Sequence, residues 1–62
     1  MIVKIVIHTD NAAFEDNASQ ETARILRELA TRIDGHPHFE PGHDQTLRDV
    51  YGDEVGYLTL HE

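Results

Sequence analysis

The sequence predicts a small α+β domain of β-α-β-β order, in which one helix packs on a three-stranded sheet. Three observations predict it. Alternating β-branched residues open the chain, an amphipathic segment of period 3.6 follows, and a glycine-centred hairpin ends it. The 62 residues contain one such set of segments, so we expect a single domain over residues 1–62 with a thin hydrophobic core.

The first predicted element is a strand over residues 2–8, with the sequence IVKIVIH. Side chains alternate between the two faces of a strand, so Val3, Ile5 and Ile7 share one face. Ile2 and Val6 lie on the other face, together with Lys4 and His8. Both faces of this strand are therefore apolar, although one helix covers only one face of a sheet.

The stretch HTDNAAFEDNASQET, residues 8–22, joins the strand to the helix. Phe14 is its only large apolar side chain, and we expect it to anchor the end of the core. Asp10 and Asn11 follow the strand directly and favour a turn in which an Asx side chain accepts from nearby amides. On this interpretation the polar residues bind backbone groups. The alternative is contact with a ligand or a partner.

A helix is predicted over residues 18–34, because apolar residues recur there on one stripe. Asn17 is placed as the N-cap with Gln20 three residues later in a capping-box arrangement, and Gly35 as the C′ glycine. The favourable order of Glu28 and Arg32 predicts an i,i+4 ion pair. The stripe consists of Ala18, Thr22, Ile25, Leu26, Leu29 and Ile33, with Ala30 on its edge.

A histidine-rich loop over residues 35–45 follows the helix and contains both prolines of the chain. A hairpin over residues 46–60 comes next, with strands at 46–50 and 55–60. Gly52 lies in its turn and supplies the positive φ that a type I turn with a G1 bulge requires.

The composition disfavours several classes of function. Five basic and twelve acidic residues give a net charge of −7, which opposes binding to nucleic acid or to an anionic membrane. There is no cysteine, as in proteins of a reducing cytoplasm, and the longest apolar run is too short to span a bilayer or to act as a signal peptide. We expect a cytoplasmic protein that binds a protein partner with a basic surface, or one whose acidity serves solubility alone.

His36, His38 and His43 are the best candidates for a metal site, because zinc binds three or four nitrogen or carboxylate ligands that a loop can gather. Glu40 and Asp44 lie close by in the sequence. The spacing matches no established zinc motif, and solvated loop histidines are the alternative. No nucleophile, histidine and carboxylate form a catalytic pattern, and there is no phosphate-binding glycine motif. We therefore expect no catalytic residues and no cofactor.

Two surfaces are candidates for an interface. Ile2 and Val6 of the first strand belong to one of them, together with one side of the last strand, which carries Tyr57 on one face and Leu58 and Leu60 on the other. We expect this surface to form a homodimer, with two sheets packed face to face or paired edge to edge; the alternatives are a docking surface for another protein and cover by the histidine loop. Arg24 and Arg27 form the second, a basic patch that either pairs locally with Glu21, Glu28 and Asp34 or contacts a partner.

The blocks HTDNAAFED, ETARILRELA and LRDVYGDEVG resemble a group of small phage and prophage proteins. That group has the pattern T-D-N-A-A-F, then E-x-A-R-I-L-R-x-L-A, then L-x-D-x-N-G-N-x-V-G. The chain departs from it at Ala18, where proline is common, and at Tyr51 and Asp53, which flank Gly52 in place of the asparagines of N-G-N. The resemblance implies a noncatalytic protein that binds and inhibits or modulates a host protein, in the manner of counter-defence inhibitors such as anti-CRISPR proteins. The alternative is a metal-binding or regulatory module built on the histidine loop.

Overall fold

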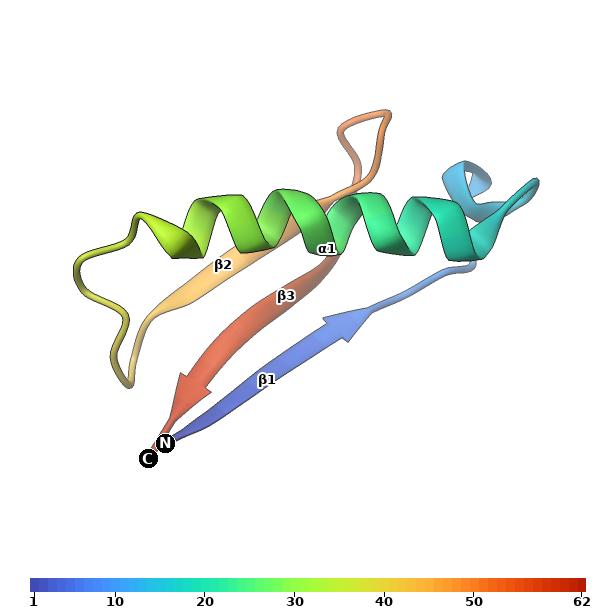
Figure 1. The fold of residues 1–62 in the computed structure, drawn as a ribbon. Helices are drawn as coiled ribbons and strands as arrows, with labels where there is room; N and C mark the ends of the chain where they lie inside the picture. The colour runs from blue at the N-terminus through green and yellow to red at the C-terminus, as the bar shows by residue number, and fades with distance from the viewer.

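The computed structural model describes residues 1–62 and confirms the predicted class, one helix on a three-stranded antiparallel sheet (Figure 1). Strand order in the sheet is β1-β3-β2, so the last strand of the chain lies in the middle. Its elements are β1 (Ile2–Ile7), the 3-10 turn η1 (Ala12–Phe14), α1 (Ala18–Asp34), β2 (Asp44–Arg48) and β3 (Glu54–His61).

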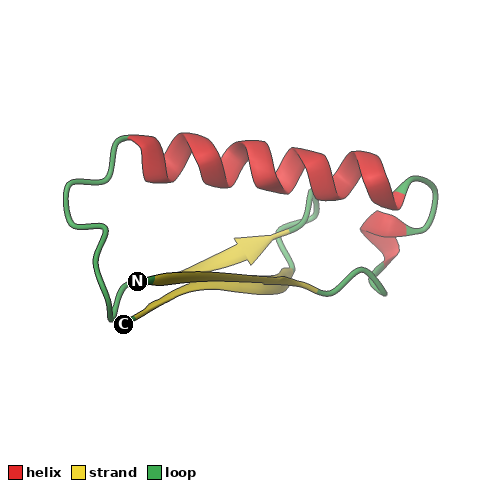
Figure 2. Ribbon diagram, turned by 60° about the horizontal axis from the view of Figure 1, so that its bottom comes forward, coloured by secondary structure: helices red, strands yellow, loops and turns green.

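The topology is a split β-α-β unit. β1 and β2 are each antiparallel to β3, so they run parallel to one another with β3 between them. Parallel strands need a long crossover connection, and α1 supplies it. Figure 2 shows that the whole of α1 lies on one side of the sheet, and no element covers the opposite side.

The register decides which side chains face α1. Directly opposed residues of an antiparallel pair share a face, and β1 pairs Val3 with Leu60 and Ile5 with Leu58. β2 pairs Leu47 with Gly56 on the same face. This inner face therefore carries apolar residues from all three strands.

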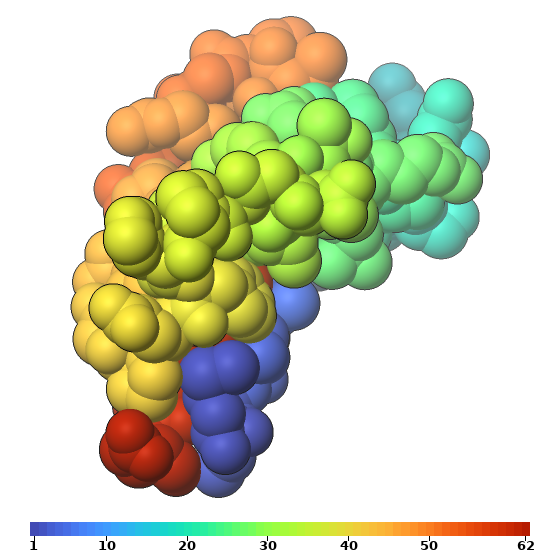
Figure 3. All heavy atoms as spheres, turned by 60° about the vertical axis from the view of Figure 1, so that its left-hand side comes forward, coloured from blue at the N-terminus to red at the C-terminus, as the bar shows by residue number.

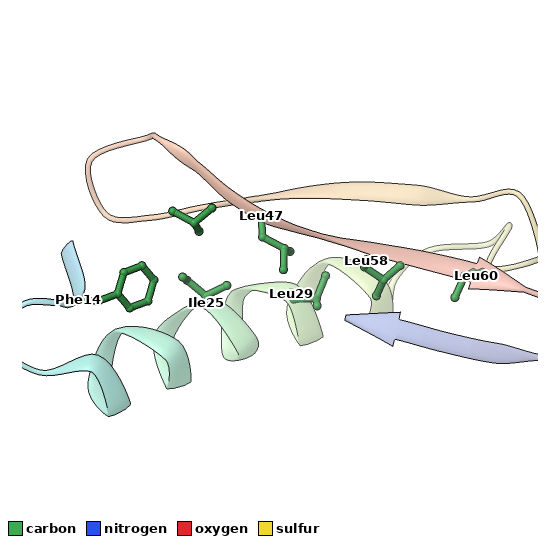
Figure 4. Close-up of a cluster of buried hydrophobic side chains, with 7 residues drawn as sticks. Phe14, Ile25, Leu29, Leu47, Leu58 and Leu60 are labelled. Carbon is green, nitrogen blue, oxygen red and sulfur yellow. The ribbon is translucent and has the colours of Figure 1, made fainter. Parts of the chain in front are cut away.

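A single cluster of seven side chains forms the core between α1 and the sheet (Figure 4). Phe14 closes one end of it, which confirms its predicted role as an anchor. The molecule measures 36 × 19 × 17 Å and buries only 10 of its 62 residues, so the core is one side chain deep. Its members are Phe14, Ile25, Leu29, Leu47, Val55, Leu58 and Leu60.

The start of α1 agrees with the predicted N-cap. Asn17 accepts a hydrogen bond from the Gln20 backbone N–H at 3.0 Å. The Gln20 side-chain oxygen accepts a hydrogen bond from the Asn17 side-chain amide at 3.3 Å. In a capping box it would instead accept from the Asn17 backbone N–H. At the other end, Gly35 caps the helix with a φ of −99°, so the left-handed conformation expected of a C′ glycine is absent.

The hairpin is longer at its base than predicted. Gly42 adopts a φ of 96°, which turns the loop so that its N–H donates to the Leu60 carbonyl at 3.2 Å. Leu60 in turn donates to the His43 carbonyl, also at 3.2 Å. The ladder thus begins inside the predicted histidine loop, and β2 starts at Asp44. At the tip, Gly52 has a φ of 88°, which confirms its predicted turn role.

The tip of the hairpin is closed by Asp49, which is 5% exposed. Its Oδ1 accepts from the backbone N–H groups of Tyr51 and Asp53, each at 2.9 Å. The register of the two strands shifts between Leu47 and Arg48, so β2 ends earlier than the predicted Val50. Val50 then lies outside the sheet and is exposed.

The helix lies over β2 and β3 and leaves β1 largely uncovered. A helix with its side chains is about 10 Å wide and strands are about 4.8 Å apart, so one helix covers about two strands. Val3 and Ile5 are on the inner face but remain 46% and 42% exposed. Leu26, expected in the buried stripe, is 41% exposed, whereas Glu21, which was not expected to be buried, is only 8% exposed.

We expect Gly56→Ala to destabilise the protein strongly. An added Cβ would overlap the Val6 carbonyl oxygen and lie 3.0 Å from Ile7 Cα, both of which belong to the β1 backbone. Because the paired backbone has little room to move, the variant should lose about 3 kcal/mol of unfolding free energy, the upper end of usual overpacking costs. Chemical denaturation measures this loss.

Gly35→Ala is the matched control, because a Cβ at Gly35 has no heavy atom within 4 Å and the φ there is negative. Its unfolding free energy should stay within about 0.5 kcal/mol of the original. Equal losses in the two variants would contradict the close packing of β1 against Gly56.

Candidate interaction surface

An ion pair on α1 connects the helix to the β2–β3 turn. Arg24 Nε lies 2.7 Å from Glu21 Oε1, and Arg24 Nη2 donates to Glu21 Oε2 at 3.0 Å. Glu21 Oε2 also accepts from the Val50 backbone N–H at 2.8 Å. The hydrogen bonds from Arg24 lower the pKa of Glu21 below its ordinary value of 4.5, against the opposing effect of burial.

Two arginines of α1 occupy the outer edge of β2. Arg24 Nη2 donates to the Arg48 carbonyl at 3.2 Å, and Arg32 Nη1 donates to the Thr46 carbonyl at 3.3 Å. These carbonyls point away from β3, where an additional strand would bind. Arginine side chains therefore protect this edge from pairing with another chain.

Of the two alternatives for the basic patch of Arg24 and Arg27, local pairing is confirmed for Arg24 and not for Arg27. Arg24 pairs with Glu21 and Glu28 and bonds to β2, so it serves the fold. Arg27 is exposed and forms no ion pair. The predicted pair of Glu28 with Arg32 is replaced by the pair of Glu28 with Arg24, because Arg32 reaches β2 instead.

The outer edge of β1 has no such protection. His8 donates to the Val55 carbonyl at 2.8 Å, which makes His8 and Val55 a hydrogen-bonded pair of the ladder. Such pairs alternate along antiparallel strands, so the even-numbered residues of β1 bond to β3 and the odd-numbered ones point outward. No side chain or loop of the protein bonds to those outward groups, which belong to Val3, Ile5 and Ile7.

The sheet face opposite α1, here called the open face, carries an apolar group beside β1. Val6 is half-buried and directly opposite Tyr57, which is 39% exposed. Ile2 lies on the same face, opposite His61, and is 61% exposed. Figure 3 views the molecule from the side of α1, and even on that side the atoms at the start of the chain, beside the C-terminus, are not covered by the helix.

Leu58 and Leu60 do not belong to the open face. The register places them on the inner face, where they are 0% and 3% exposed in the core. Their proposed part in an interface is therefore wrong, because α1 already covers them. Of the predicted contact residues on the two strands, Ile2, Val6 and Tyr57 remain accessible to a partner.

The histidine loop does not assemble the predicted metal site. The rings of His36 and His43 approach to 4.3 Å between centroids, but His36 Nδ1 accepts from the His38 backbone N–H at 3.2 Å. The His38 side chain is exposed, and no group of three His, Asp or Glu side chains is placed to hold a metal ion. Phe39 packs toward His43 instead, which makes the loop a cover for that end of the core.

Two shallow depressions mark the surface. One, of about 350 Å³, lies between residues 41–44 and 59–62, and the other, of about 450 Å³, follows the last turns of α1. In the first, Thr59 Oγ1 lies 2.9 Å from His61 Nε2, but no carboxylate bonds to that histidine. A nucleophile oriented by a histidine and a carboxylate is therefore not formed there.

No family model, curated protein or solved structure matches this chain. The resemblance of its three sequence blocks to phage proteins therefore stays a prediction. α1 has 17 residues and charged groups along its length, and no helix of the structure has the size and apolar surface needed to cross a membrane.

We expect the Glu21 ion pair to make stability depend on pH. The lowered pKa of Glu21 means that the pair stabilises the folded state above pH 4.5, and that this stabilisation is lost as the pH falls through the lowered pKa. Glu21→Gln removes the charge and keeps an oxygen for the Val50 N–H. Its melting temperature should be lower than that of the original protein at neutral pH, and the difference should shrink below pH 4.5. A difference that stays constant across a pH series of circular dichroism melts would contradict this.

We expect the histidine loop to bind zinc no more tightly than isolated histidines do. Only His36 and His43 bring their rings together, whereas stable zinc sites use at least three protein ligands. Isothermal titration with zinc should give no heat of binding at micromolar metal. A saturable heat that His36→Ala abolishes would contradict the geometry described above.

Proposed function

We propose that this chain is a noncatalytic protein-binding module whose docking surface is the open face of the sheet. The observation that carries the proposal is the apolar group of exposed Ile2 and Tyr57 and half-buried Val6, on a face that no element of the fold covers. Tyr57, opposite Val6, is the largest side chain of this group. Tyrosine is typical of residues that dominate binding energy, because its ring is large and has few rotatable bonds.

The partner that we propose is a protein with an apolar centre to its contact surface and a basic overall charge. The open face carries both Asp44 and Lys4, one on each side of Thr59, but the chain as a whole carries a charge of −7. This overall charge speeds encounter with a basic protein and disfavours acidic partners, including nucleic acids. The apolar centre then supplies most of the affinity.

The biological class that we propose is a phage or prophage protein that inhibits or modulates a host protein by occupying its surface. The support is the resemblance of the three sequence blocks, together with the acidity and small size of the chain. Counter-defence inhibitors of the anti-CRISPR kind act in this way, and binding alone suffices for them.

Tyr57→Thr should abolish capture of the partner. Threonine keeps the strand preference of the position and removes the ring from the open face. Affinity capture from a bacterial lysate, followed by quantitative mass spectrometry, should recover one protein near stoichiometric level with the original chain and at least about tenfold less with the variant.

Tyr51→Thr is the matched control, because Tyr51 is 70% exposed in the hairpin turn and lies outside the open face. It should capture as much partner as the original chain. Recovery of no stoichiometric protein, or equal recovery with both variants, would count against the proposal. Raising the salt concentration should weaken binding if the negative charge of the chain contributes, and unchanged binding would assign the acidity to solubility alone.

A further inference from the structure

We infer that the open edge of β1 binds β1 of a second copy of this chain in antiparallel orientation, with Ile5 on the two-fold axis. This inference goes beyond the proposed function, because it concerns the edge of the sheet and not the open face. The two three-stranded sheets would join into one sheet of six strands, with both helices on the same side.

The first support is the difference between the two edges of the sheet. Arg24 and Arg32 occupy the outward carbonyls of β2, at 3.2 and 3.3 Å. The outward N–H and C=O groups of β1 have no partner in the protein. Proteins usually block exposed edges with charges, short strands or bulges. β1 has six residues, no bulge and only one charged residue, Lys4, whose side chain lies on the open face, so its edge is available for pairing.

The second support is the parity of the exposed groups. A two-fold axis perpendicular to the sheet pairs odd residues with odd residues, and the odd residues of β1 are those that point outward. With Ile5 on the axis, Ile5 faces Ile5 of the second copy, and Val3 faces Ile7. All three outward residues of each strand then find hydrogen-bonding partners in one register.

One of the two neighbouring registers is disfavoured by charge. A shift of the axis to Lys4 would place two lysines directly opposite each other, which is destabilising. With Ile5 on the axis, each Lys4 lies opposite Val6 of the other copy. The single charge of β1 therefore disfavours the register with Lys4 on the axis. A shift in the other direction, to Val6, would place Val3 opposite Thr9, which lies outside the strand.

The overall charge also favours β1 as the contact. All twelve acidic residues lie outside residues 1–9, so two chains of charge −7 approach one another with least repulsion along β1. The edge of β2, by contrast, begins with Asp44 and is covered by charged side chains of α1.

The third support is the apolar surface that flanks the edge. Val3 and Ile5 are 46% and 42% exposed on the inner face because α1 is displaced toward β2. An α-helix turns about 100° per residue, so Leu26 lies about 200° around α1 from Arg24. Because Arg24 contacts β2, Leu26 lies on the side of the helix that faces away from β2. Pairing would bring Val3 and Ile5 of each copy beside Ile7 and Ile5 of the other and remove part of this apolar surface from water.

The dimer would also extend the proposed docking surface. The open faces of the two copies would lie side by side in one sheet, and their groups of Ile2, Val6 and Tyr57 would be related by the two-fold axis. A partner with two-fold symmetry, or one with a broad apolar surface, would contact both groups at once.

Introducing a charge at position 5 tests the register of the proposed dimer. Sedimentation equilibrium of the original chain at about 10 to 100 micromolar should give twice the chain mass of 7.1 kDa, as for a weak dimer with a contact one strand wide. Ile5→Lys and Ile5→Glu should each weaken self-association at least about tenfold, because like charges would then face each other on the axis. A one-to-one mixture of the two variants should form the dimer again, since lysine would face glutamate.

Gln20→Lys and Gln20→Glu are the controls, because Gln20 is exposed on α1 away from the sheet. They introduce the same charges and should give the same mass by sedimentation equilibrium as the original chain. Circular dichroism melts establish that each variant is folded. The mass of the original chain tests the dimer without any variant, and a chain that stays at 7.1 kDa throughout would overturn the inference.

A cysteine at position 5 gives an independent readout, because the chain has no cysteine of its own. Directly opposed residues of a hydrogen-bonded pair have Cα atoms about 5.5 Å apart, which is within the range of a disulfide. Ile5→Cys should form a disulfide dimer under mild oxidation much faster than Gln20→Cys. Equal rates, or a folded mixture of Ile5→Lys and Ile5→Glu that remains monomeric, would overturn the register. The test measures self-association alone, so its failure is distinct from failure to capture a partner through Tyr57.

Discussion

The position of α1 depends on the ion pair between Glu21 and Arg24. Glu21 accepts a hydrogen bond from the Val50 N–H at the β2–β3 turn. Arg24 donates hydrogen bonds both to Glu21 and to the Arg48 carbonyl. These contacts fasten the first half of the helix to β2. Arg32 fastens the second half to the same strand through Thr46. The helix is therefore held at one side of the sheet rather than over its centre.

Both candidate interaction surfaces follow from this placement. The arginines that hold the helix also fill the edge of β2, so one edge of the sheet is closed to other chains. The edge of β1 stays open, and Val3 and Ile5 beside it stay partly exposed, because one helix covers only about two strands. The opposite face has no cover of any kind. None of the elements within residues 1–62 forms a second layer there, so the apolar side chains on that face are accessible to other molecules.

The sequence by itself determined which segments form helix and strand and where several of them begin or end. Alternation of β-branched residues located β1, and the 3.6-residue period located α1 from Ala18 to Asp34. Asn17 as N-cap, Phe14 as anchor and Gly52 in the turn were all predictable, because each depends on the residue and its close neighbours in the chain. Local backbone geometry and local hydrogen bonds depend on residues that are close in the sequence, so a short segment is enough to predict them.

The tertiary structure alone decided how the elements lie against one another. Periodicity identifies the apolar stripe of a helix but not its sideways position on a sheet, so Leu26 was expected in the core and Glu21 was not. Strand order and register decided that Leu58 and Leu60 face α1 while Tyr57 faces away from it. The roles of Arg24 and Arg32 depend on carbonyl groups of a strand more than a dozen residues further along the chain. Such contacts depend on long-range packing. A local pattern of residues does not predict which backbone groups a long side chain will bond to.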